Sequence, residues 1–256
     1  MPRLKAGAVP IVLSALAAVL SGLALLFAAG IFDGSRPNSA DFEAQTRDYL
    51  LKNPEIIVEA VQGLEERRQT AEANELDAVI AGRREEIFND PDAPVSGSPD
   101  GDVALVEFFD YNCPYCRKAA PLILQAMEAD PGLKFVFKEW PILGGSSEFA
   151  ARAALASRRQ GKYEEFHHAL MTYSGSVSES STLVVAEQVG LDIEQLKRDM
   201  EEPAISAAIE RNKALANELR ITGTPAFVVG RNIVRGLVDL NTLQQLIADA
   251  RVHAKD

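Results

Sequence analysis

The sequence predicts an α/β domain with a helical insertion, preceded by an apolar N-terminal helix and a helical stalk. Two observations support the α/β assignment. Residues 103–109 are β-branched and aromatic apart from one acid, which is typical of a buried parallel strand, and residues 133–140 form a similar run. The chain between these runs has helical spacing, so the three segments are predicted to form a β-α-β unit.

The first 32 residues are predicted to be an export or anchor segment. Arg3 and Lys5 are followed by no charged residue until Asp33. This uncharged run exceeds the ~20 residues that span a bilayer, whereas a signal-peptide core has only ~7–15 apolar residues. An uncleaved anchor is therefore favoured, and the small residues 28–30 leave a cleaved signal peptide as the alternative. In both cases the remainder of the chain is expected outside the cytosol.

Residues 33–40 read as a turn-rich linker, and residues 41–90 are predicted to form a helical stalk. Pro54 suits the start of a second helix within this stalk. Narrow apolar stripes run along both helices and comprise Phe42, Tyr49, Leu50, Ile57, Val61 and Leu64. Because so narrow a stripe buries little surface by itself, we expect the stalk to pack on further copies of the chain. An inert spacer is the alternative.

The composition fits one globular domain with these appendages. The chain has 256 residues, of which 47% are hydrophobic and 25% charged. Its formal net charge of -11 argues against a nucleic-acid partner, because binding a phosphate backbone requires a basic face. The sequence also lacks the glycine patterns of nucleotide-binding loops, so no nucleotide cofactor is expected.

The only two cysteines, Cys113 and Cys116, lie where the first predicted strand passes into a helix. The free N–H groups and the positive dipole end of that helix stabilise a thiolate, so Cys113 is the candidate nucleophile. Cys116 lies one turn further on and can attack a mixed disulfide formed at Cys113. Pro114 suits the first helical position, and Pro114 and Tyr115 influence the reduction potential. The pair is predicted to be a redox-active disulfide that acts without another cofactor.

Two other roles for the cysteines, a zinc site and a structural disulfide, agree less well with the sequence. Zinc needs about four ligands, but there is no second cysteine pair, and His167, His168 and His253 are not spaced as its ligands. A disulfide that closes so small a loop constrains the unfolded chain only slightly. No metal site is therefore expected.

Residues 106–116 resemble the active-site segment of the DsbA-like thiol-disulfide oxidoreductases of the thioredoxin superfamily. Residues 221–227 resemble the loop of that superfamily in which a cis-proline faces the active-site cysteines. The resemblance implies that Thr224 and Pro225 shape the substrate site and that their peptide bond is cis. It covers roughly residues 100–256 and implies a thioredoxin fold.

Within this fold, helix-like segments between about residues 146 and 220 are predicted to form the helical insertion. They cover residues 148–157, 163–171, 182–189, 193–200 and 204–219. A hairpin over residues 226–234 and a helix over residues 240–250 are expected to end the domain. His167 and His168 are interpreted as ordinary residues of the second of these helices.

Glu107 is a further candidate, because a carboxylate within an apolar strand is costly unless it is paired or used. Burial should raise its pKa. The family resemblance implies an acid beneath the buried cysteine, where Glu107 would exchange protons with Cys116. The alternative is a strand-end acid that reaches solvent.

The stalk carries a second resemblance. Residues 49–57 and 64–67 resemble the amino-terminal oligomerisation segment of suppressor-of-copper-sensitivity C proteins, which include trimeric disulfide isomerases. This resemblance implies a homo-oligomer formed through the stalk. It also suggests an alternative function, copper(I) binding and copper tolerance through the soft thiolates of Cys113 and Cys116.

Together these observations predict an exported thiol-disulfide oxidoreductase, an isomerase or oxidase of periplasmic proteins. Its expected substrates are protein thiols and disulfides, and its expected redox partner is a membrane protein. The expected location is the periplasmic side of the bacterial inner membrane, by a single N-terminal anchor, or the periplasm after cleavage. The direction of the reaction stays open.

Overall fold

The computed structural model describes residues 20–22, 24–25 and 39–253. The predicted anchor or signal segment lies almost entirely outside these residues. Within the described part of the chain, no helix is both long enough and apolar enough to cross a membrane. The chain divides between Gln69 and Thr70 into two units, and each is considered by itself.

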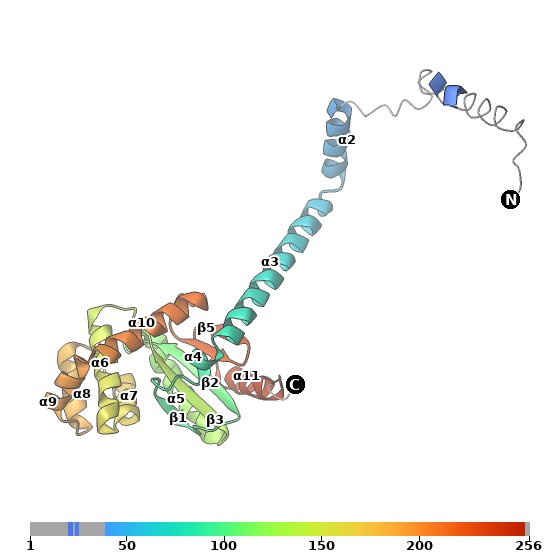
Figure 1. The fold of residues 1–256 in the computed structure, drawn as a ribbon. Coiled ribbons are helices and arrows are strands. Elements are labelled where there is room, and N and C mark those ends of the chain that lie inside the picture. The colour runs from blue at the N-terminus through green and yellow to red at the C-terminus, as the bar shows by residue number, and fades with distance from the viewer. Residues whose placement is uncertain (1–19, 23, 26–38, 254–256) are drawn as a thin grey trace, which may run out of the picture. The chain divides into compact units, whose positions relative to one another are not determined.

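The first unit consists of helix α2, Ser39–Lys52, and the beginning of helix α3, Glu55–Gly82 (Figure 1). The two helices meet at Asn53 and Pro54, where the side-chain amide of Asn53 donates to the carbonyl of Tyr49 at 2.8 Å. Seven large apolar side chains of these two helices are exposed: Phe42, Tyr49, Leu51, Ile57, Val58, Val61 and Leu64. The unit therefore has an apolar surface that its own helices leave uncovered.

The second unit is built on a five-stranded sheet with the order β1-β3-β2-β4-β5. Strands β2 (Val103–Phe109) and β3 (Leu133–Glu139) run parallel, as the sequence predicts, and form the centre of the sheet. The hairpin of β4 (Ala226–Val229) and β5 (Asn232–Arg235) joins antiparallel to β2. Strand β1 (Val95–Gly97), a short edge strand antiparallel to β3, was not predicted from the sequence.

Helix α5 (Pro114–Ala129) connects β2 to β3, and Pro121 lies inside it without ending it. The chain between β3 and β4 is helical and in Figure 1 it gathers beside the sheet. Its elements are α6 (Gly145–Ser157), η1 (Arg158–Gln160), α7 (Tyr163–Thr172), α8 (Glu179–Gln188), α9 (Ile193–Met200) and α10 (Pro203–Glu218). Helix α11 (Leu240–His253) packs against α5, β2 and β4. The result is a thioredoxin-like α/β fold with added helices.

The central strands are buried on both faces, and successive side chains enter different cores because a strand has a period of two. Leu105 and Phe135 belong to the larger cluster, which includes both cysteines. Val106 and Val136 belong to a smaller cluster on the other face. That smaller cluster also takes in Ile80 of α3 and Ile87 and Phe88 of α4 (Arg84–Phe88). The chain after Thr70 is therefore part of the second unit's core.

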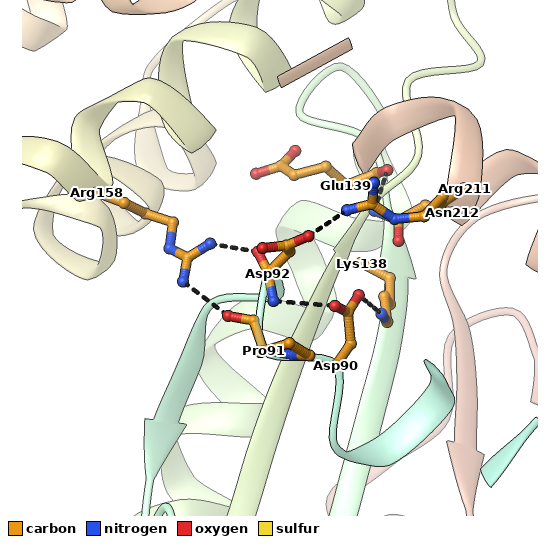
Figure 2. A network of polar contacts seen from close by, with 8 residues as sticks. All are labelled: Asp90, Pro91, Asp92, Lys138, Glu139, Arg158, Arg211 and Asn212. Atoms are coloured by element: carbon orange, nitrogen blue, oxygen red, sulfur yellow. Dashed lines mark hydrogen bonds and ion pairs between the residues drawn. The ribbon is translucent and has the colours of Figure 1, made fainter. Parts of the chain in front are cut away.

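A buried ion pair ties the segment before β1 to the sheet (Figure 2). The Nζ of Lys138 lies 2.6 Å from Oδ2 of Asp90, and the Lys138 side chain is only 1% exposed. Burial lowers the pKa of Lys138. Burial by itself would raise the pKa of Asp90. The hydrogen bond and the charge of Lys138, together with the N–H of Asp92 and the charge of Arg211, outweigh burial and lower that pKa. The neighbouring Asp92 binds Arg158 and Arg211, which attaches the segment to η1 and α10 as well.

Candidate active site

The dithiol lies at the start of α5, directly after β2. Cys113 is the N-cap residue with extended backbone angles, Pro114 is the first helical residue, and Cys116 lies in the first turn. The backbone N–H of Cys113 donates to the carbonyl of Asp110 at 3.0 Å, which closes the turn between strand and helix. Both cysteines are free thiols, with Cys113 4% exposed and Cys116 fully buried. The positions match those expected for an attacking and a resolving thiol.

The loop before β4 faces the first of these thiols. The Sγ of Cys113 donates to the carbonyl oxygen of Thr224 at 3.2 Å. The Thr224-Pro225 peptide bond is cis, which confirms the prediction from the sequence. Pro225 is buried, whereas Tyr115 is 55% exposed beside the dithiol. The structure therefore brings together Cys113, Thr224 and Pro225, with Pro114 and Tyr115 at the rim of the site.

Glu107 lies on β2 beneath the dithiol and is 1% exposed, which excludes the alternative of a strand-end acid that reaches solvent. Its Oε1 has no hydrogen-bond partner in the described part of the chain. Burial raises the pKa of Glu107 well above its ordinary value, and the charges of Cys113 and Glu139 raise it further. Burial and the charge of Glu107 also raise the pKa of Cys116. Glu107 and Cys116 are therefore both held more strongly in their protonated forms than exposed groups of the same kind.

A buried carboxylate fixes the loops around the dithiol. Asp110 accepts bonds from the backbone N–H groups of Asn112, Ile142 and Leu143, at 2.7–2.9 Å, and from the Ser147 hydroxyl at 2.8 Å. These bonds place the loop after β3 and the start of α6 next to the active-site turn.

The turn is also attached to the loop between α7 and α8. Asn112 donates to the carbonyl of Val177 at 2.9 Å and accepts from its N–H at 2.8 Å. Arg117 donates to the carbonyl of Gly175 at 2.6 Å and to that of Tyr111 at 2.9 Å. The helical insertion therefore supports the dithiol from one side.

The family of the chain is shown by its match to a protein-family model. The model of the DSBA-like thioredoxin domain matches residues 104–248, which contain the dithiol, Glu107 and the Thr224-Pro225 loop. The chain belongs to this family. The model of the Copper resistance protein ScsC N-terminal domain matches residues 39–71, which lie in the predicted stalk.

Solved structures agree with this assignment. A thioredoxin-like oxidoreductase from Silicibacter pomeroyi DSS-3 is 54% identical, with a TM-score of 0.65, and the match covers 66% of this chain and 98% of that one. Proteus mirabilis ScsC in a transitional conformation is 28% identical, with a TM-score of 0.63, over 84% of this chain and 99% of its own.

Curated relatives include much longer proteins. The Na(+)/H(+) antiporter NhaA 3 of Salinispora tropica is 25% identical over 169 residues, which are 65% of this chain and 26% of the antiporter. This chain thus spans about a quarter of the length of the first curated relatives it matches.

DsbA-like proteins are thiol-disulfide oxidoreductases that use a redox-active disulfide without a further cofactor. Both cysteines of this chain lie within the residues that match the family model. Among the described residues, no three His, Cys, Asp or Glu side chains are grouped so as to hold a metal ion.

A buried polar cluster that was not predicted from the sequence lies on the same side of the sheet as the dithiol. The Oε1 of Glu139 accepts hydrogen bonds from the hydroxyls of Tyr111 and Tyr163, both at 2.8 Å. The Tyr111 hydroxyl also lies 3.1 Å from Nδ1 of His167. His167 is buried, so its interpretation as an ordinary helix residue overlooked this contact, while the adjacent His168 is exposed. The available signal was Glu139 itself, a second acid in a strand that is otherwise mainly apolar.

Proposed function

We propose that the chain is an exported oxidoreductase that isomerises or oxidises disulfides of periplasmic proteins through Cys113 and Cys116. The single observation that carries this proposal is the contrast between the two thiols. Cys113 caps a helix and faces the Thr224 carbonyl, whereas Cys116 is fully buried near Glu107. A helix N-terminus favours the thiolate that attacks, and burial keeps the second thiol protonated until it is needed.

In the reducing direction, the Cys113 thiolate attacks one sulfur of a client disulfide. The client S–S bond breaks, its second sulfur leaves and takes a proton, and a mixed disulfide joins the client to Cys113. Cys116 then attacks Sγ of Cys113 while its proton passes through ionised Glu107 to solvent, and the first client sulfur leaves as a thiolate. Oxidation of a client runs through the same steps in reverse. Isomerisation uses the first attack and lets another client thiol, rather than Cys116, release the enzyme.

The client is proposed to bind as an extended segment along the Thr224-Pro225 loop. Cys113 has no S–H group once it has ionised or is joined to a client, so the Thr224 carbonyl that accepted the bond from the thiol becomes available to a client N–H. The exposed ring of Tyr115 offers an apolar contact at the same edge.

The stalk is proposed to join copies of the chain. Its exposed apolar side chains surround a groove of about 370 Å³ lined by Phe42, Leu50, Leu51 and Ile57, together with Glu43, Thr46 and Arg47. An apolar surface of this kind is covered when helices of several copies pack together. The match to an ScsC N-terminal domain supports this proposal.

The location is proposed from residues 1–32, whose charge pattern suits an anchor with the catalytic unit in the periplasm. A relative from Salmonella enterica serovar Typhimurium is described as a periplasmic thioredoxin-like protein. In that compartment a membrane redox partner would return the dithiol to its working state.

The test uses the whole chain with two ribonuclease substrates in defined glutathione buffers. Recovery of activity from scrambled ribonuclease reports isomerisation, and recovery from reduced ribonuclease reports oxidation. We expect recovery in at least one assay, and Cys113→Ser is expected to abolish it. If the wild-type chain accelerates neither reaction, the proposed function is wrong.

A second candidate, copper(I) binding, is suggested by the copper-resistance description of the matching N-terminal domain. The two thiolates would be the soft ligands. Retention of one copper(I) per chain against a strong chelator, lost in Cys113→Ser, would favour this function. Equal copper retention by the wild type and by that variant would exclude these cysteines as its site.

A further inference from the structure

Two acids lie on one face of the sheet beneath the dithiol. In the register of β2 and β3, Glu107 is opposite Phe137 and Glu139 is opposite Phe109. Because side chains alternate between faces, both acids point to the face that carries Phe109 and Phe137 in the larger core cluster. The acids are thus diagonal neighbours, with Cβ atoms about 8 Å apart by the ordinary spacing of strands and residues.

Both carboxyl groups are incompletely hydrogen-bonded. The Oε1 of Glu107 and the Oε2 of Glu139 have no hydrogen-bond partner in the part of the chain that the structure describes, and each side chain is 1% exposed. Ionising both groups would bury two like charges with two unpaired oxygens, which is strongly unfavourable. The pair is therefore built to keep at least one proton.

The hydroxyl groups that donate to Glu139 stabilise its ionised form, but they do not fully offset the effect of burial. Burial raises the pKa of Glu139 to about 8, although the hydroxyls of Tyr111 and Tyr163 oppose the rise and Asp110 adds to it. On the backbone side, Asn212 of α10 donates to the Glu139 carbonyl at 3.0 Å (Figure 2). The titratable groups around this cluster are Glu107, Asp110, Tyr111, Cys113, Cys116, Arg158, Tyr163, His167 and His168.

We propose that Glu139 is the second member of a carboxyl pair that binds a proton when the Cys113-Cys116 disulfide is reduced and releases it when the disulfide forms. This inference rests on the proposed thiol-disulfide exchange. Reduction creates a negative charge at Cys113, and that charge disfavours ionisation of Glu107, so the two carboxyl groups taken as a unit hold their protons more strongly in the reduced state. Glu139 touches neither sulfur and acts through Glu107 and Tyr111, so it is a positioning residue.

The step balances with glutathione as the reductant. Two glutathione thiols supply two electrons and two protons, the enzyme S–S bond breaks, and glutathione disulfide forms. Cys113 leaves as a thiolate and Cys116 keeps one proton. The second proton goes to the carboxyl pair, whereas without the pair it is released to solvent.

This proton balance has a measurable consequence. If reduction releases the proton to solvent, the equilibrium constant for reduction rises about tenfold per pH unit. If the carboxyl pair retains the proton, this constant depends less steeply on pH. The informative quantity is the equilibrium constant for reduction of a variant divided by that of the wild type. The ionisation of glutathione affects both constants equally and therefore cancels in this ratio. We expect this ratio for Glu139→Gln to rise with pH near the pKa of about 8, by up to about tenfold per pH unit.

The experiment equilibrates the whole chain with glutathione buffers over a pH series, followed by an acid quench, alkylation and mass measurement of the oxidised fraction. Glu165→Gln is the matched control, because Glu165 is an exposed acid on the same helix as Tyr163. Its ratio to the wild type is expected to stay constant with pH. Tyr163→Phe removes one donor to Glu139 while keeping the acid, and should move the pH dependence to higher pH.

The outcomes separate the two proposals. A wild-type chain that never exchanges with glutathione would contradict the proposed function itself. Normal exchange with pH-independent ratios for both Glu139→Gln and Tyr163→Phe would overturn the proton-binding pair, because a purely structural role alters stability and not the number of protons taken up. If Glu139→Gln fails to fold, Tyr163→Phe alone decides between these results.

Discussion

The Sγ of Cys113 lies 3.2 Å from the carbonyl oxygen of Thr224, although 111 residues separate the two in the chain. This contact ties the start of α5 to the loop before β4, so the attacking thiol and the proposed client-binding edge are held together. The free thiol occupies an acceptor that a client could use after the mixed disulfide forms. Attack by Cys113 and hydrogen bonding of the client backbone to Thr224 can therefore occur in succession at the same site.

Cys116→Ser is expected to accumulate mixed disulfides with client proteins, because attack by Cys113 proceeds while resolution cannot. Cys113→Ser should accumulate none, since Cys116 is fully buried and its raised pKa keeps it protonated. Non-reducing electrophoresis of acid-quenched samples detects these species. Equal trapping by the two variants would mean that the assigned roles are wrong.

The buried pair of Lys138 and Asp90 gives a prediction about stability. Asp90→Asn leaves a buried ammonium without its partner and should lower the free energy of unfolding by about 3–5 kcal/mol. Lys138→Met replaces the ammonium by an apolar side chain of similar length, and the carboxylate that it leaves unpaired is 16% exposed and can be hydrated, so this change should cost less. Arg211→Ala, which breaks an exposed pair with Asp92, is the control and should cost about 0–1 kcal/mol. Urea unfolding measures all three, and equal losses for Asp90→Asn and Lys138→Met would contradict this account.

The sequence reveals Glu107 because a single acid interrupts an apolar run that leads directly to the dithiol. Glu139 was equally visible but adjoins Lys138 near a strand end, where charges are common. Its importance depends on Tyr111 and Tyr163, which reach it from separate elements. Such convergence arises only in three dimensions, and no spacing along the chain indicates it.

Helices and strands with a clear pattern of apolar residues were predicted well, whereas elements that depend on tertiary packing were not. Strand β2 has the predicted bounds, because its apolar run is continuous. Strand β1 has three residues, too few to establish a period, and depends on pairing with β3. Ile80 and Ile87 lie within residues 41–90, which were predicted to form the stalk, yet both residues enter the core of the second unit.

Buried His167 and buried Glu139 make the free energy of unfolding depend on pH in opposite directions. The pKa of His167 is lowered to about 3 by burial, so between about 3 and 6.5 the unfolded chain binds more protons, and stability rises with pH. The pKa of Glu139 is raised to about 8, so between about 4.5 and 8 the native chain binds more protons, and stability falls as pH rises.

Above pH 6.5 the His167 contribution is complete, and the fall caused by Glu139 remains, up to about 1.4 kcal/mol per pH unit. We expect the free energy of unfolding of reduced Glu139→Gln, relative to the reduced wild type, to increase between pH 6.5 and 8. Urea unfolding at each pH measures this difference, in which the contributions of other groups largely cancel. A constant difference would show that Glu139 does not carry the proton.

The last prediction concerns the stalk, because an isomerase benefits from several dithiol units that hold one misfolded client together. Joining units raises their effective concentration at the client without any new contact. A chain beginning at Thr70 keeps the α3 residues that pack on the sheet and removes the apolar surface of the first unit. We expect this shorter protein to be monomeric by sedimentation, to react with small dithiols like the chain of residues 33–256, and to lose most of its activity on scrambled ribonuclease.

A full-length variant distinguishes the effect of losing the oligomer from the effect of removing the first unit. Leu51 is 71% exposed and lines the stalk groove, so Leu51→Glu should place a charge in the proposed contact without disturbing the second unit. It is expected to behave like the shorter protein, while Lys52→Gln, an exposed change in the same helix, should leave assembly intact. If residues 33–256 sediment as a monomer, or if the shorter protein isomerises equally well, the stalk is only a tether. The chain would then be better described as a simple oxidase, because one dithiol unit is sufficient to oxidise a client.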